Sequence, residues 1–374
     1  MLPLTMVDLN SQYQKIKPQV DAAIQSVIDN AQFIKGPEVS SFQDELAAYL
    51  GVKHTIACGN GTDALQIAMM ALGLKPGDEV ITTDFTFIAT VEVIALLGLT
   101  PVLVDVYPDT FTIDIEAAKK AITPRTKAIV PVHLFGQAAN MEALMELAIA
   151  NHLFVIEDNA QAIGTDYTFS DGTVKKAGTI GHIGCTSFFP SKNLGCYGDG
   201  GAMFTNDDAL AEQISSIVNH GMKVRYYHDR IGVNSRLDTI QAAILRVKLP
   251  LLDLYNGARQ KAAAYYNEAF KTISEIQIPQ VAPFTSHTYH QYTLLVKNGK
   301  RDALKNFLDA RGIPNMVYYP VPLHQQKAFE NYKTEQDYPV TQKLCNEVLS
   351  LPMHTELTEE QLELISSSVN AFFN

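Results

Sequence analysis

The sequence predicts an α/β fold in two parts, a large domain with a mostly parallel sheet flanked by helices and a smaller C-terminal α/β domain. Short β-branched runs alternate with longer helical stretches from Thr55 to Thr205, and this alternation is typical of a parallel sheet covered on both faces. Apolar residues at helical spacing precede this region, and the pattern changes after about residue 250. We therefore expect the large domain over residues 1–250 and the small domain over residues 251–374.

The elements of the large domain can be placed in order along the chain. Helices are expected within residues 11–50, where apolar side chains recur at helical spacing, with a turn at Phe33-Ile-Lys-Gly-Pro37. Strands are expected at residues 55–58, 79–83, 102–106, 128–132, 153–156, 185–189 and 201–205. Helices fit between them at residues 62–73, 87–98, 114–122, 141–151 and 207–220.

The C-terminal part begins within a long helix. Helical spacing continues over roughly residues 236–268, and Pro250 should interrupt it. Beyond it, helices rich in alanine, asparagine and charged residues accompany one clear strand at residues 292–296. This is the basis for a separate, smaller α/β domain.

Composition and charge exclude several classes of protein. The 374 residues are 47% hydrophobic and 18% charged, as in an ordinary globular protein, and the net charge of −11 argues against nucleic acid or an anionic membrane as a main partner. No signal peptide or membrane-length apolar run is visible. The cysteines lack metal-binding spacing, so we expect no metal and free thiols in a reducing cytoplasm. They are Cys58, Cys185, Cys196 and Cys345.

Two charged residues at predicted strand ends suggest a catalytic site. Lys192 follows one strand and precedes a glycine-rich turn, and Asp158 ends another strand 34 residues earlier. Parallel strands bring their carboxyl ends to one edge of the sheet, where ligands bind. A pyridoxal phosphate enzyme needs such a pair, because the lysine forms a Schiff base and the acid keeps the pyridine nitrogen protonated. Taken singly, Lys192 would be a surface residue and Asp158 a helix cap.

A phosphate-binding turn is predicted where the first strand meets its helix. In Gly59-Asn-Gly61-Thr62-Asp-Ala64, glycines allow close backbone approach, and the helix N-terminus offers unpaired N–H groups. Thr62 can add a hydroxyl, and Ser187 is a second candidate phosphate ligand. Phe87, after the second strand, can stack on a pyridine ring, although a core role is the alternative.

The same turn matches the dinucleotide-binding pattern G-x-G-x-x-A, with Asp84 standing 20 residues beyond Ala64. A nicotinamide enzyme is therefore an alternative, as is a purely structural turn. Nothing later in the chain resembles a hydride-transfer site, and a nicotinamide enzyme would leave Asp158 and Lys192 without roles.

Several segments together make the chain similar to the DegT–StrS family of sugar aminotransferases, which are dimeric, fold type I pyridoxal phosphate enzymes. The resemblance runs nearly from end to end. It is carried by residues 61–65, 76–80, 155–158, 187–192, 198–201, 234–238 and 319–322.

The resemblance implies a role for each matching residue. Lys192 would hold the cofactor as a Schiff base and shuttle the proton, with Asp158 as partner of the pyridinium. Gln161 would lie near the ring hydroxyl, and the phosphate would be held at Gly61, Thr62 and Ser187. Asn234 would reach the phosphate from the partner subunit, so a homodimer with shared active sites is expected.

Within the family, the chain is most similar to aminotransferases that act on a UDP-linked 2-acetamido-2-deoxy-3-oxo-glucuronic acid. This implies transfer of the amino group of glutamate to C3 of the sugar, yielding 2-oxoglutarate, in cytoplasmic synthesis of a surface polysaccharide such as O-antigen. Arg236 would bind the sugar carboxylate, and Tyr318 and Tyr319 would line the sugar pocket. Tyr318 stands where many relatives have histidine.

Three alternatives remain within the same fold. The first is an aminotransferase acting on a dTDP-linked 3-oxo- or 4-oxo-6-deoxyhexose, since the segment around Arg236 is shared with such relatives. The second is a sugar dehydratase, although those relatives replace the lysine that this chain retains. The third is a non-catalytic regulator, which the intact pair of Asp158 and Lys192 argues against.

Overall fold

The computed structural model describes residues 4–332 and 335–374, and its core is a seven-stranded sheet with the strand order β1-β9-β8-β5-β4-β2-β3. The pairs β2·β3, β2·β4, β4·β5 and β5·β8 are parallel, and β9 runs antiparallel to both β8 and β1. The sheet is therefore mostly parallel, as predicted. Its strands are β1 (His54–Cys58), β2 (Glu79–Thr83), β3 (Thr100–Val104), β4 (Thr126–Val130), β5 (Phe154–Asp158), β8 (Ile183–Ser187) and β9 (Gly201–Thr205).

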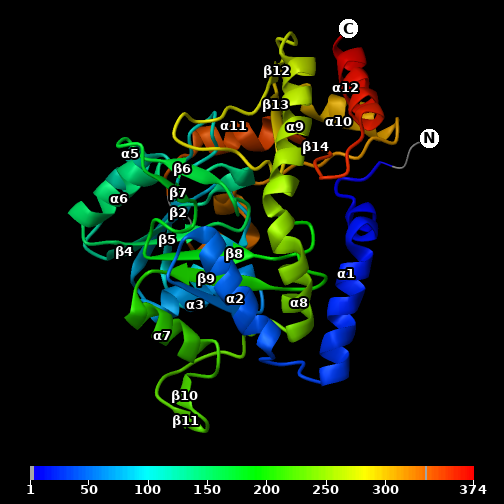
Figure 1. The fold of residues 1–374 in the computed structure, drawn as a ribbon. Helices are drawn as coiled ribbons and strands as arrows, with labels where there is room; N and C mark the ends of the chain where they lie inside the picture. The colour runs from blue at the N-terminus through cyan, green and yellow to red at the C-terminus, as the bar shows by residue number, and fades with distance from the viewer. Residues whose placement is uncertain (1–3, 333–334) are drawn as a thin grey trace.

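Helices cover both faces of this sheet (Figure 1). Along β1, Ile56 packs toward α3 and α7 while Ala57 packs toward α2 and α8, so the alternation of a strand sorts its side chains between two cores. The helices around the sheet are α1 (Leu9–Asn30), α2 (Pro37–Leu50), α3 (Gly61–Ala71), α4 (Ala89–Leu96), α5 (Ile115–Lys120), α6 (Met141–Ala150), α7 (Asp208–Ile217) and α8 (Thr239–Lys248).

A second, smaller sheet follows in the C-terminal part, with the order β12-β13-β14 and both pairs antiparallel. Its strands are β12 (Ile276–Gln277), β13 (Tyr292–Val296) and β14 (Val348–Leu351), and the helices around it are α9 (Leu252–Phe270), α10 (Arg301–Asp309), α11 (Pro339–Glu347) and α12 (Glu359–Phe373). Only β13 was predicted. β14 was not predicted, because it follows α11 directly and no turn residue marks the boundary between them.

The predicted interruption of the long helix is confirmed. Pro250 lies in a 3₁₀ turn (Leu249–Leu251) that joins α8 to α9, because proline cannot donate the hydrogen bond that a continuous helix requires. In Figure 1, α9 leads from the body of the large sheet to the small sheet. The division into domains at residue 250 stays a prediction.

Three predicted strands begin and end two residues earlier in the structure, and prolines explain two of these shifts. β3 begins at Thr100 and includes Pro101, which is tolerated because β3 is an edge strand. β4 ends at Val130 because Pro131 follows and has no N–H for the ladder. The strand predicted at residues 185–189 also begins and ends two residues earlier, as β8 (Ile183–Ser187).

Two short hairpins were not predicted. β6 (Asp166–Thr168) pairs with β7 (Val174–Lys176), and β10 (Met222–Val224) pairs with β11 (Tyr227–His228). The four cysteines are buried and free. Among the described residues, no helix is both long and apolar enough to cross a membrane.

Candidate active site

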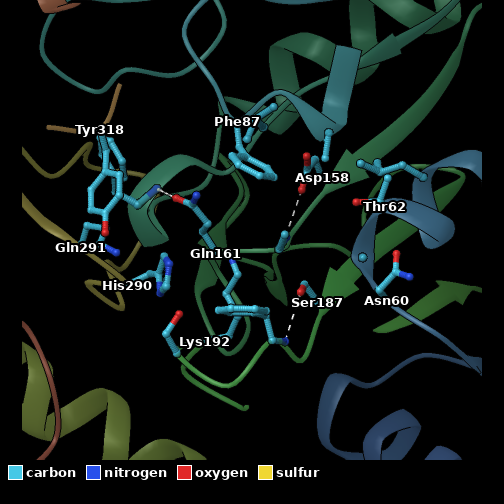
Figure 2. A pocket seen from close by; sticks show the side chains of 18 of the residues that line it. Asn60, Thr62, Phe87, Asp158, Gln161, Ser187, Lys192, His290, Gln291 and Tyr318 are labelled. Atoms are coloured by element: carbon cyan, nitrogen blue, oxygen red, sulfur yellow. Dashed lines mark hydrogen bonds between the residues drawn. The ribbon is translucent and has the colours of Figure 1, made fainter. Parts of the chain in front are cut away.

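A cavity of about 630 Å³ opens at the carboxyl ends of the sheet strands, and most of the predicted site residues line it. Side chains from several separate segments point into it (Figure 2). The predicted residues that the structure brings together here are Gly61, Thr62, Phe87, Asp158, Gln161, Ser187, Lys192, Tyr318 and Tyr319.

One wall of the cavity is the N-terminus of α3. Asn60 caps this helix, its side chain accepting a hydrogen bond from the N–H of Asp63 at 2.8 Å. A Cβ at Gly61 would stand 2.7 Å from the Cβ of Ser187, so only glycine lets α3 begin this close to the end of β8. The first N–H groups of a helix lack intrahelical acceptors. Together with the hydroxyls of Thr62 and Ser187, they form a cradle suited to a phosphate.

Asp158 ends β5 and is held in place by two hydrogen bonds. Its Oδ2 accepts from the hydroxyl of Thr90 at 2.8 Å, and its Oδ1 accepts from the N–H of Ala160 at 3.1 Å. The residue is 6% exposed. Thr90 lies in the first turn of α4 and was not predicted, because no local signal connects it with a strand end 68 residues away.

The acid next to it, Glu157, points to the opposite face of the strand and is completely buried. It accepts hydrogen bonds from Nε2 of His133 at 2.8 Å and from the N–H groups of Gly178 and Ile180 at 2.7 and 2.6 Å. Burial alone would raise the pKa of Glu157, but His133 and the N–H groups of Gly181 and Gly178 hold it below its usual value. Glu157 is therefore a buried carboxylate that supports the strand carrying Asp158.

Lys192 lies in a turn after β8, where its N–H donates to the carbonyl of Phe189 at 2.8 Å. Burial lowers the pKa of its ammonium group to about 8, and the negative charge of Asp158 opposes this shift. An amine with this pKa is neutral in a useful fraction near neutral pH, as a Schiff-base lysine requires. Figure 2 shows Lys192 and Asp158 facing the same cavity.

Gln161 joins the large sheet to the C-terminal part of the chain. Its Oε1 accepts from the N–H of Phe135 at 2.7 Å, and its Nε2 donates to the hydroxyl of Tyr319 at 3.2 Å. Tyr319 in turn lies against Phe87, with ring centroids 6.2 Å apart. Phe87 is 54% exposed, so its ring offers an open surface on which a planar ligand can stack.

The cavity also includes polar residues that the sequence analysis missed. His290 is 5% exposed, and its Nδ1 has no hydrogen-bond partner. Burial, with the charges of Lys192 and Arg259, lowers its pKa well below the usual value, so the imidazole is neutral. The signal available for His290 and Gln291 was a pair of polar residues directly before the predicted strand at 292–296. The other missed lining residues include Asn60, Ser191 and Asp199.

Asn234 and Arg236 lie outside this cavity. Asn234 forms an isolated bridge with Asn219. Arg236 lines a different pocket of about 300 Å³ together with Lys35, whose pKa is lowered by burial and by the charge of Arg236. Within one chain, the two residues do not reach the site of Lys192. Their action in the site of a second subunit stays a prediction.

At the strand ends of this fold, a buried acid and a lysine of lowered pKa line one cavity beside a phosphate cradle. This arrangement is that of a pyridoxal phosphate-dependent aminotransferase. The particular family follows from the sequence. The chain belongs to the DegT/DnrJ/EryC1/StrS aminotransferase family, whose model matches residues 14–370.

Individual relatives agree with this assignment over nearly their whole length. The UDP-2-acetamido-2-deoxy-3-oxo-D-glucuronate aminotransferase of Pseudomonas aeruginosa is 46% identical over 366 residues, which cover 98% of this chain and 99% of the relative. A protein of Geobacillus stearothermophilus called pleiotropic regulatory protein is also 46% identical, with 98% of each chain covered. The crystal structure of DesV from S. venezuelae in complex with a ketimine intermediate has a TM-score of 0.96 at 39% identity, covering 100% of this chain and 99% of that one.

The residues present fit pyridoxal phosphate. The cradle at Gly61 has no room for a side chain, which leaves the backbone accessible to a phosphate, and Phe87 presents a free aromatic face beside it. Asp158 is a buried acid at the end of β5, and Lys192 follows β8, the strand that pairs with β5. The nicotinamide alternative is wrong, and the side chain of Asp84, which it required for a ribose, is fully buried and paired with His324.

Proposed function

We propose that this aminotransferase moves the amino group of glutamate to C3 of a UDP-linked 2-acetamido-2-deoxy-3-oxo-hexuronic acid. The observation that carries the transaminase chemistry is the shared cavity of Lys192 and Asp158. The substrate is supported by the relative from Pseudomonas aeruginosa, whose name states a 3-oxo-glucuronate. The product would serve surface polysaccharide synthesis, including O-antigen, in the cytoplasm.

Each cavity residue has a task in this reaction. Bound pyridoxal phosphate would supply an electron sink for the carbanion formed at the amino-bearing carbon. Lys192 would hold the cofactor through its amine and, when that amine is free, would carry the proton to and from that carbon. Asp158 would keep the ring nitrogen protonated by accepting its hydrogen bond. The cradle of Gly61, Thr62 and Ser187 anchors the phosphate, while Phe87 and Gln161 hold the ring in orientation.

Arg236 is the proposed ligand of the sugar carboxylate, while the choice of a uronate rests on the relative from Pseudomonas aeruginosa. A guanidinium binds a carboxylate through two parallel hydrogen bonds, and Arg236 takes part in none of the ion pairs among residues 4–332 and 335–374. Because Arg236 and Asn234 lie outside the cavity of their own chain, we propose that they enter the cavity of a second subunit. The functional unit is then a homodimer with shared active sites.

The alternative substrate is a dTDP-linked 3-oxo- or 4-oxo-6-deoxyhexose, which has no carboxylate for Arg236 to bind. The test is reverse transamination with 2-oxoglutarate on a panel of UDP- and dTDP-amino-sugars. We expect the UDP-linked 3-amino uronate to react fastest, by about tenfold or more over its neutral counterpart, since a bidentate charged pair contributes about 1.5–3 kcal/mol. Equal rates for uronate and neutral sugars would contradict the uronate assignment.

A regulatory role without catalysis is the alternative from another class, and one relative carries a regulatory name. The intact pair of Lys192 and Asp158 supports catalysis instead. A same-fold dehydratase is disfavoured because Lys192 is present. The absorption spectrum separates these alternatives: the aminotransferase should show a visible band that glutamate converts to a near-ultraviolet form, whereas a protein that binds no cofactor should show neither.

A further inference from the structure

The side chain of Asp84 is buried at the end of β2 and is engaged by one residue far along the chain. Its Oδ1 accepts a hydrogen bond from the N–H of His324 at 2.7 Å, and its Oδ2 pairs with Nδ1 of His324 at 2.5 Å. The carbonyl of Asp84 also accepts from the N–H of Leu323 at 3.2 Å. The carboxylate is 0% exposed and the imidazole 20% exposed. A buried carboxylate requires such partners, and three bonds to consecutive residues fix the position of that segment.

The segment held in this way lines the cavity. Residues 318 and 319, the two tyrosines of the proposed sugar pocket, stand six and five positions before His324. Phe85, next to Asp84, packs edge-on against Tyr319 with ring centroids 6.1 Å apart. The end of β2 therefore holds both ends of the stretch from Tyr319 to His324. Figure 2 shows Tyr318 at the edge of the cavity, away from Thr62 and the phosphate cradle.

Among the described residues, no other carboxylate or ammonium group bonds the stretch from Tyr319 to His324 to the large sheet, and Leu323 adds apolar packing with Val91 of α4. Further along the chain, the hydroxyl of Tyr338 donates to the carbonyl of Leu103 at 3.4 Å, and Asp105 accepts hydrogen bonds from the N–H groups of Val340 and Thr341 at 2.9 and 2.8 Å. These contacts begin at residue 338 and cannot fix the tyrosines alone. The hydrogen bond from Gln161 to Tyr319 is neutral and 3.2 Å long, and it is weaker than hydrogen bonds to a buried carboxylate.

We propose that Asp84 and His324 are positioning residues for the sugar-nucleotide substrate. They fix the segment 318–324 so that Tyr318 and Tyr319 form one wall of the sugar pocket, while taking no part in binding the cofactor. The proposal rests on the proposed function in one respect, that a nucleotide sugar is the substrate that meets these tyrosines.

The test compares Asp84→Ala and His324→Ala with the conservative Asp84→Asn. The two alanine variants should raise the KM for the amino-sugar nucleotide about tenfold, as expected for the loss of a charged hydrogen bond. The spectral half-reaction with glutamate should stay within about twofold of wild type, because the cofactor is held by other residues. Asp84→Asn keeps an acceptor for the N–H of His324 and should retain a KM close to that of wild type.

A second readout does not depend on the substrate. Hydrogen–deuterium exchange of peptides covering residues 316–326 should increase in both alanine variants of the apoprotein, since the segment loses its tether. The matched control is His54→Ala, which removes the imidazole from the exposed pair of His54 and Asp208. It should change neither the exchange of this segment nor the KM. If Asp84→Ala does not fold, His324→Ala carries the test.

Several outcomes would overturn the proposal. One is unchanged exchange over residues 316–326 in His324→Ala. Another is increased exchange with a normal KM for the sugar nucleotide, because the segment would then be tethered without positioning the substrate. A loss of cofactor absorption equal to the loss of activity would also contradict it. If wild-type protein aminated no nucleotide sugar, the proposed function would fail, and the exchange result alone would still decide whether Asp84 fixes this segment.

Discussion

The hydroxyl of Thr90 donates a hydrogen bond to Oδ2 of Asp158 at 2.8 Å, from the first turn of α4 to the end of β5. With the N–H of Ala160 on Oδ1, it fixes the orientation of the carboxylate that faces the cavity. The free lone pairs of Asp158 can then point at a ring nitrogen without reorganisation when a ligand binds.

This relationship predicts graded effects on turnover. Asp158→Ala should lower kcat by about 10²- to 10³-fold, because the charge on the ring nitrogen loses its partner. Thr90→Val should lower it by roughly tenfold, since the carboxylate remains but loses one hydrogen bond. Both are measured by steady-state kinetics of the purified proteins. Near-normal turnover in Asp158→Ala would show that the acid is not the partner of the pyridinium.

Lys192→Ala should abolish the visible absorption band and lower turnover by about 10²- to 10⁴-fold, because nucleophile and proton carrier disappear together. Lys127→Ala is the control, since Lys127 is exposed and its amine donates to the carbonyl of Pro124, away from the cavity. A visible band that survives in Lys192→Ala after addition of pyridoxal phosphate would place the Schiff base on another lysine.

The lowered pKa of Lys192, about 8, predicts how cofactor attachment depends on pH. Raising the pH through 8 converts the ammonium to the reactive amine, from about a tenth neutral at pH 7 to about nine tenths at pH 9. The rate at which the visible band appears when apoprotein meets pyridoxal phosphate should therefore rise about tenfold over this range. A midpoint near 10.5, the usual value for lysine, would show that burial does not act on Lys192 in this way.

Gly61→Ala should weaken cofactor binding about tenfold, because a methyl group 2.7 Å from the Cβ of Ser187 forces the phosphate cradle open. Equilibrium titration of apoprotein with pyridoxal phosphate measures the effect. Gly257→Ala is the control, since a Cβ at this position in α9 meets nothing within 4 Å. It should leave affinity unchanged and raise the free energy of unfolding by about 0.5–1 kcal/mol. Equal affinities for the two variants would argue against the cradle.

Glu157→Gln should lower the free energy of unfolding by about 3–5 kcal/mol, because it breaks a fully buried pair with His133. Since the pKa of Glu157 in the folded protein lies below 4.5, its stabilisation is present above pH 4.5 and is lost as the pH falls through the folded value. The variant should show a shallower loss of stability in acid, measured by denaturant unfolding. In contrast, Glu212→Gln removes an exposed pair with Lys223 and should leave the free energy of unfolding nearly unchanged.

Much of the fold was predictable because it depends on local patterns. The β-branched run at β2 and the short apolar run at β9 give those strands with their correct limits, and the proline at 250 marks the junction of α8 and α9. The phosphate cradle was predictable for the same reason, since a turn rich in glycine and the start of its helix are adjacent in the sequence. The limits of β3 and β4 were not, because sheet partners decide whether a proline is tolerated or ends a strand.

The site itself divides in the same way. Lys192, Asp158, Gln161 and Ser187 could be placed from strand ends, since parallel strands bring their carboxyl ends to one edge. The residues that hold them come from distant segments: Thr90 is 68 residues from Asp158, and His324 is 240 residues from Asp84. No periodicity relates such pairs.

The sequence by itself determined the order of elements, the acid and lysine of the proposed catalytic pair, and the family to which the chain belongs. Only the tertiary structure decided what Asp84 binds. A sequence pattern could assign Asp84 to a ribose, but it is buried and makes three hydrogen bonds to the segment that follows Tyr318 and Tyr319. It also decided that Asn234 and Arg236 lie apart from the cavity of their own chain. The physical reason is that side-chain environment depends on which distant elements pack together, and local sequence does not contain that information.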